Sequence, residues 1–107
     1  MAASRCTEVS VSGGVKTVRF VAEPSSAQLM GGEFAEELLD LVDSDATIVL
    51  DFSGVKSITS KMISDLLVMH KAVRAHQGEL ILTGMSAHVV DVFKTTGLDK
   101  CFEIRPS

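Results

Sequence analysis

The sequence contains no tryptophan and no tyrosine, and it has only two prolines and two cysteines. Without tryptophan and tyrosine side chains there is little for nucleic-acid bases to stack on. In addition, no segment concentrates lysine and arginine. Ten basic residues against fourteen acidic ones give a formal net charge of −4. This balance disfavours binding to polyanions, so we expect neither nucleic acid nor a membrane surface as a partner.

Long apolar runs are also absent. None approaches the roughly 18 residues needed to span a bilayer, and the first residues lack the apolar stretch of a signal peptide. These absences predict a cytoplasmic protein. Cys6 and Cys101 lie near opposite ends and belong to no CxxC pair or Cys/His cluster. This pattern indicates two unrelated thiols and no disulfide.

What is present is typical of one globular domain. The chain has 107 residues, of which 46% are hydrophobic and 22% charged, close to the averages for globular proteins. No repeat, low-complexity tract or linker divides it. We therefore expect a single domain over residues 1–107, large enough for a core without disulfide staples.

Alternating polar and apolar residues predict a hairpin at the N-terminus. Its strands are Thr7–Val11 and Val15–Ala22, joined at Gly13-Gly14 and ended by Glu23-Pro24. Further strands are predicted over 46–52, 79–83 and 101–104. The run 46–52 is almost entirely apolar, which is typical of a strand covered on both faces.

Helical periodicity predicts three main helices. The first covers 33–42; Ser25 or Ser26 could cap an earlier start, but Gly31-Gly32 would then lie inside the helix. Its solvated face is acidic and contains Glu33, Glu36, Glu37 and Asp40.

The longest helix is predicted over Lys61–His76, ended by Gly78. Its inward stripe is Ile63, Leu66, Leu67, His70 and Val73, whereas Ser64, Asp65, Lys71 and Arg74 point outward. A last helix of about ten residues begins after Ser86 and closes at Gly97.

The resulting order of elements is β-β-α-β-α-β-α-β. Alternating strands and helices specify the α/β class. We predict a mainly parallel five-stranded sheet with an antiparallel N-terminal edge strand and about three main helices.

Enzyme chemistry finds little support. There is no glycine-rich phosphate loop, and His70, His76 and His88 lack metal-binding spacing. Asp51 at a strand end suggests a phosphorylated receiver domain, but only Glu23 could supply a further carboxylate for Mg²⁺. We expect Asp51 to bond amides of the following turn. The prediction is a non-enzymatic protein with no catalytic residue, metal or cofactor.

One loop stands out. Between the strand ending at Phe52 and the helix starting near Lys61, the chain places four hydroxyl residues, Ser53, Ser57, Thr59 and Ser60. Partners usually dock at the carboxyl ends of parallel strands, and a helix N-terminus accommodates a phosphate. Thr59 or Ser60 could equally be a plain N-cap. Both interpretations remain open, and they are compatible.

Two segments give the chain a family resemblance. Ile48–Val55 and Val89–Ile104, with Gly97-Leu98 between the last helix and strand, resemble the STAS domain, the family of sulfate transporters and anti-sigma factor antagonists. The resemblance extends from the hairpin to Ile104. It implies an anti-sigma factor antagonist that binds a kinase-type anti-sigma factor, and phosphorylation at the start of the second main helix would block this binding.

The signature loop departs from the family pattern, Asp-Ser-Ser/Thr-Gly-Leu-Gly. Thr59 replaces the aspartate, Ser60 keeps the first serine, Lys61 occupies the usual acceptor position, and Met62 and Ser64 replace the glycines. The acceptor candidates are therefore Ser60 and Thr59, and the expected partner-binding residues are Ser57, Thr59, Ser60, Lys61 and Ser64. Two alternatives are an unswitched STAS scaffold of a stress-signalling complex and a small nucleotide- or anion-binding module.

Overall fold

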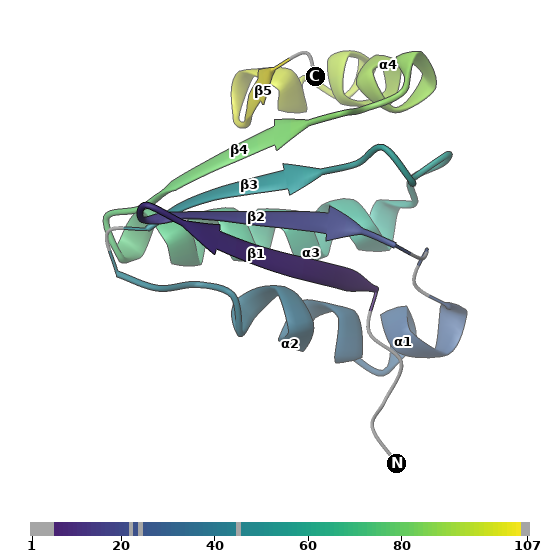
Figure 1. The fold of residues 1–107 in the computed structure, drawn as a ribbon. Helices are drawn as coiled ribbons and strands as arrows, with labels where there is room; N and C mark the ends of the chain where they lie inside the picture. Colours follow the sequence, from purple (N-terminus) through teal and green to yellow (C-terminus); the bar gives the residue numbers. More distant parts are fainter. Residues whose placement is uncertain (1–5, 22, 24, 45, 106–107) are drawn as a thin grey trace.

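The computed structural model describes residues 6–21, 23, 25–44 and 46–105. Ten elements follow one another along the chain (Figure 1). They are β1 (Thr7–Ser12), β2 (Val15–Phe20), α1 (Ser26–Met30), α2 (Glu33–Leu39), β3 (Thr47–Asp51), α3 (Ser60–Ala75), β4 (Glu79–Thr83), α4 (Ala87–Thr95), the 3₁₀ turn η1 (Leu98–Lys100) and β5 (Glu103–Arg105).

The strands form one sheet in the order β1-β2-β3-β4-β5. β1 is antiparallel to β2, and the other neighbours are parallel. The predicted α/β class and sheet are confirmed. Gly13 and Gly14 join the hairpin with φ of 55° and 81°, a backbone conformation that favours glycine. Of the predicted strand residues, Ala22 lies outside the described part of the chain, as does Pro24.

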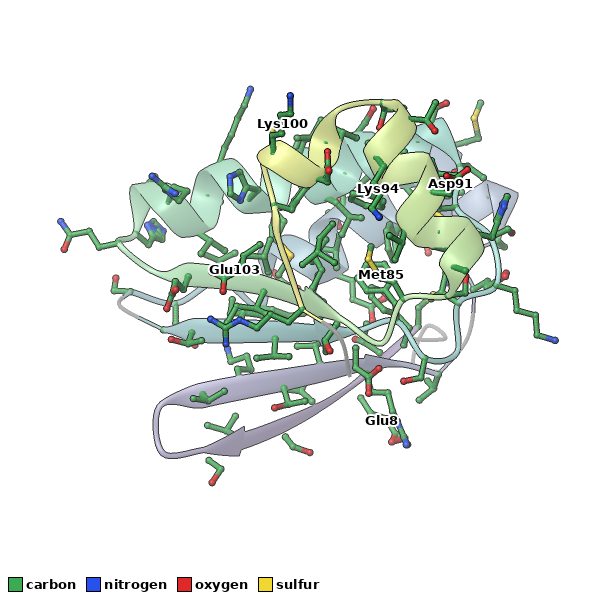
Figure 2. The ribbon with its side chains drawn as sticks, turned by 90° about the horizontal axis from the view of Figure 1, so that it is seen from above. Glu8, Met85, Asp91, Lys94, Lys100 and Glu103 are labelled. Carbon is green, nitrogen blue, oxygen red and sulfur yellow. The ribbon has the colours of Figure 1, made fainter. Side chains whose placement is uncertain are left out.

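All helices lie on one side of the sheet, as Figure 2 shows from above. The prediction that 46–52 is covered on both faces is therefore wrong. Ile48 and Leu50 are fully buried, whereas Thr47, Val49 and Asp51 face the open side and are half-buried. Val49 is the register partner of Ile81. These two apolar side chains shield each other on the open face, so the apolar run needs no second helix layer.

Phenylalanines fill much of the core between sheet and helices. The ring centroid of Phe20 lies 4.9 Å from that of Phe52 and 6.0 Å from that of Phe34. A second pair, Phe93 and Phe102, meets edge to face at 5.6 Å. Such tilted and edge-on pairs join the strands to α2, α4 and the segment before β5.

The first predicted helix corresponds to α2, and a separate short helix, α1, precedes it. Ser25 caps α1 in a capping box with Gln28, and Gly32, at φ 81°, separates α1 from α2. α2 ends at Leu39, earlier than predicted. Beyond it, the Lys16 ammonium donates to the Leu41 carbonyl at 2.9 Å and pairs with Asp43. This contact holds the chain in a non-helical path.

Glu37 departs from the predicted solvated acidic face of this helix. Its carboxylate accepts hydrogen bonds from the Cys6 and Thr7 amides and, at 2.6 Å, from the Thr7 hydroxyl. The carboxylate therefore fastens the start of β1 to α2. Glu33, Glu36 and Asp40 are exposed, as expected.

The remaining boundaries agree with prediction within two residues. At the end of α3 the left-handed residue is Gln77, at φ 62°, and not Gly78. A Cβ on Gly78 would lie 2.5 Å from the Ala46 carbonyl oxygen, so the glycine permits a close backbone approach. Ser86 caps α4 as predicted. No helix in the described part of the chain is long and apolar enough to cross a membrane.

Candidate interaction surface

The N-terminus of α3 lies at the edge of the sheet where β2, β3 and β4 end (Figure 1). We call the surface there the crest and define it by the five predicted partner-binding residues, Ser57, Thr59, Ser60, Lys61 and Ser64. All five are exposed. The structure thus places all five at or just before the start of α3, where each is accessible to solvent.

The crest rests on a tight turn after β3. The Asp51 carboxylate accepts hydrogen bonds from the Ser53 amide, at 2.9 Å, and from the Ser53 hydroxyl. The Val55 amide closes the turn onto the Phe52 carbonyl at 2.8 Å. The prediction that Asp51 bonds the following turn is confirmed, and this bonding explains the aspartate without receiver-type chemistry.

Two glycines let neighbouring strand ends approach this turn. A Cβ on Gly54 would lie 2.7 Å from the carbonyl oxygen of Phe20, the last residue of β2. Gly84, after β4, has φ of 72° and abuts Asp51 and Ser53. The ends of three strands therefore pack closely beneath the crest.

Thr59 is the N-cap of α3. Its hydroxyl oxygen accepts a hydrogen bond from the Met62 amide at 3.2 Å, which satisfies one of the free N–H groups at the helix start. Ser60 is the first helical residue, and its hydroxyl makes no hydrogen bond with a described residue. Of the two acceptor candidates, Thr59 is engaged as a cap and Ser60 is free.

Lys61 and Asp65 form an ion pair along the first turns of α3. The Lys61 ammonium lies 2.7 Å from Asp65 Oδ1, and the Asp65 side chain is only 3% exposed, whereas that of Lys61 is 46% exposed. Asp65 Oδ2 is buried without a hydrogen-bond partner among the described residues. The prediction that Asp65 points outward is wrong, because it lies on the buried stripe with Met62 and Met69.

Exposed apolar side chains lie at the same end of the molecule. Val21 follows β2, and Met30, at the end of α1, is 84% exposed. α1 and the end of β2 share the edge of the sheet from which α3 starts (Figure 1). Sequence reasoning missed this pair; a methionine directly before Gly31-Gly32, where a helix must end, was the available signal.

The histidines and cysteines give no site at the crest. His70 is half-buried and its ring is tilted against that of Phe102, with the ring centroids 5.0 Å apart, while His76 and His88 are exposed. Burial and, secondarily, the charge of Arg74 lower the pKa of His70. Both described cysteines are free thiols, as predicted. Among the described residues no three His, Cys, Asp or Glu side chains could hold a metal together.

Comparison with known proteins identifies the fold. Residues 8–107 match the STAS domain family. A STAS domain protein described as an anti-sigma-factor antagonist from Planctomyces limnophilus superposes with a TM-score of 0.80 at 19% identity, covering 94% of this chain and 90% of that one. An anti-sigma factor antagonist from Mycobacterium paratuberculosis gives 0.77 at 20% identity, covering 94% and 85%.

The unphosphorylated form of the anti-sigma factor antagonist SpoIIAA is also similar. Its TM-score is 0.70 at 16% identity, covering 94% of this chain and 87% of that one. No curated protein matches the sequence closely enough to count as a relative. At these identities, the solved structures support the architecture alone.

Proposed function

Because the chain belongs to the STAS domain family, we propose that it is an anti-sigma factor antagonist whose crest binds a kinase-type anti-sigma factor. The observation that carries the proposal is the crest itself. Five exposed polar or cationic side chains gather at the N-terminus of α3, on a turn fixed by Asp51 and two close-packed glycines. Rigid elements position such surfaces better than mobile loops do.

The surroundings of the crest suit a protein partner. A protein interface combines an apolar centre with a polar rim. Val21 and Met30 supply exposed apolar area at this end of the molecule, and the crest supplies hydroxyls and the Lys61 ammonium. We propose that the partner contacts both groups together.

Phosphorylation of Ser60 would then switch the contact. The Ser60 hydroxyl is exposed and free of hydrogen bonds to described residues, whereas Thr59 holds the cap. A phosphate adds about −1.5 to −2 charges. The positive end of α3 would tolerate this charge within the domain. An interface complementary to a neutral serine would not, since an unpaired buried charge costs several kcal/mol.

Lys61 supports a second candidate, a STAS domain that binds its partner without a switch. Lysine occupies the position where the family's acceptor usually stands, and its ammonium is already engaged by Asp65 at 2.7 Å. In this alternative the crest is the same docking surface, but its charge is fixed. The two candidates differ only in whether Ser60 receives phosphate.

Affinity capture from the native host lysate tests the docking role. The bait is the full chain, and the crest variant is Ser60→Asp. Ser10→Asp is the matched control, because Ser10 is exposed on the open face of β1, away from the crest. We expect the wild type and Ser10→Asp to recover the same partner, with recovery by Ser60→Asp reduced about tenfold or more.

The identity of the captured protein and its kinase activity complete the test. The proposal requires an anti-sigma factor, identified by mass spectrometry, that transfers one phosphate from ATP to Ser60. Phosphate on neither Ser60 nor Thr59, with an active partner bound, leaves the unswitched alternative. Equal recovery by all three baits contradicts a docking role for the crest.

A further inference from the structure

An open pocket of about 340 Å³ lies at the opposite end of the domain from the crest. It is bounded by His70 and Arg74 on α3, by Glu79 and Leu80 at the start of β4, and by the segment 100–103. Parallel strands start at this edge and end at the crest, so the two surfaces are separated by the length of the sheet (Figure 1).

The pocket exists because β5 is short. β5 pairs with β4 only from Ile81 to Thr83, so Glu79 and Leu80 have no partner in β5. The chain that precedes β5 instead turns away through η1. In Figure 2, Lys100 lies with η1 on the helix side, and Glu103 lies at the level of the strands. The segment therefore forms a wall of the pocket where a longer strand would have closed it.

Charges around the pocket are incompletely paired. Arg74 and Lys100 line it, and neither forms a salt bridge with a described residue. Glu79 also lines it and has no such partner, whereas Glu103 is paired with Arg105. The pocket thus presents two cations and one carboxylate, none of which forms an ion pair with a described residue.

His70 lines the same pocket from α3. Its Nδ1 is buried with no hydrogen-bond partner in the described part of the chain. The ring is held against Phe102, which is itself buried.

The charge pattern selects among ligand classes. A simple anion would suit Arg74 and Lys100 but would face Glu79 and the negative end of the α3 dipole. A simple amine would face the two cations. A molecule with two carboxylates and one ammonium matches all three unpaired groups.

We propose that this pocket binds a small aminodicarboxylate, whose carboxylates meet Arg74 and Lys100 and whose ammonium meets Glu79. This binding is independent of the function proposed for the crest. Glutamate is the simplest probe of the class, since removing either its amine or one carboxylate gives a close analogue.

Backbone-amide NMR of the full chain, titrated with each probe to millimolar concentration, tests the assignment. The probes are L-glutamate, glutarate, which lacks the ammonium, and 4-aminobutyrate, which lacks one carboxylate. We expect glutamate to shift the amides around Arg74, Glu79 and Lys100, and to bind about tenfold more tightly than either analogue.

Single substitutions test which residues form the binding site. Arg74→Gln and Glu79→Gln should each weaken glutamate binding about tenfold. Lys71→Gln is the matched control, because Lys71 is exposed on the same helix but does not line the pocket. If Arg74→Gln fails to fold, as judged by its circular dichroism, Lys100→Gln replaces it. No shifts with glutamate, equal affinity for all three probes, or equal loss in Lys71→Gln would overturn the proposal.

Discussion

The ion pair between Lys61 and Asp65 gives the sharpest test of how the crest is built. Replacing Lys61 by methionine keeps the aliphatic stem and removes the ammonium 2.7 Å from Asp65. Asp65, only 3% exposed, then has no hydrogen-bond partner among the described residues. A buried carboxylate without a partner raises the free energy of the folded protein but not that of the unfolded chain, so the free energy of unfolding decreases.

The size of the effect follows from burial. Breaking a fully buried pair costs about 3–5 kcal/mol. Lys61 is 46% exposed, so water already screens the pair, and we expect about 1–3 kcal/mol for Lys61→Met. For a domain of this length each kcal/mol lowers the melting temperature by about 4 °C. The expected decrease is therefore about 4–12 °C.

Urea unfolding followed by circular dichroism measures this loss. Lys71→Met is the matched control, because Lys71 is exposed on the same helix and pairs with no described residue; its effect should stay within about 0.5 kcal/mol. The double variant Lys61→Met, Asp65→Leu should recover most of the loss, since a well-packed apolar pair replaces a buried charge without penalty. If Lys61→Met costs no more than the control, or the double variant recovers nothing, the reasoning is refuted.

Three further predictions use other features. Gly54→Ala should destabilise the fold by about 1–3 kcal/mol in the same unfolding assay, because its Cβ would lie 2.7 Å from the Phe20 carbonyl oxygen; an unchanged urea midpoint would contradict this. A thiol reagent should modify exposed Cys101 quickly and buried Cys6 only on unfolding, because burial and a nearby glutamate raise the Cys6 pKa; equal rates by mass spectrometry would disagree.

The third concerns pH. Burial and, secondarily, a nearby arginine hold the pKa of His70 below 6.5 in the folded state, so the unfolded chain binds this proton more tightly. The contribution to stability is present above about pH 6.5 and is lost as pH falls through the folded pKa. Between about pH 7.5 and pH 5.5, His70→Gln should lose less stability than the wild type. The charged groups of the same pocket, Arg74, Lys100, Glu79 and Glu103, remain in both proteins, and a parallel loss in both would contradict the assignment.

Most of the fold could be predicted from local patterns in the sequence. Alternation located the hairpin, and 3.6-residue periodicity located α3 and α4, because these signals depend on neighbours within one element. The apolar run over 46–52 led to the wrong prediction that this strand is covered on both faces. Periodicity cannot distinguish a second layer of helices from two neighbouring strand residues, Val49 and Ile81, that shield each other. Likewise, nothing in the sequence indicated that the Glu37 carboxylate accepts a hydrogen bond from Thr7, 30 residues away.

The candidate surface was predictable in part. The hydroxyl residues follow a strand end and precede a helix, so topology alone places them at one edge of the sheet. The inward position of Asp65 was not predicted, because charged residues are rarely buried. Its i,i+4 spacing from Lys61 was nevertheless visible, and such spacing marks pairs that meet on a helix.

The central claim is that the crest is the surface on which a partner protein docks. Hydrogen exchange of the full chain, free and bound to the protein captured by affinity, tests it most directly. The account predicts slower exchange on binding for the amides of residues 57–64 and around Met30. Slower exchange confined to the open face of the sheet, with the amides of 57–64 unchanged, would contradict it.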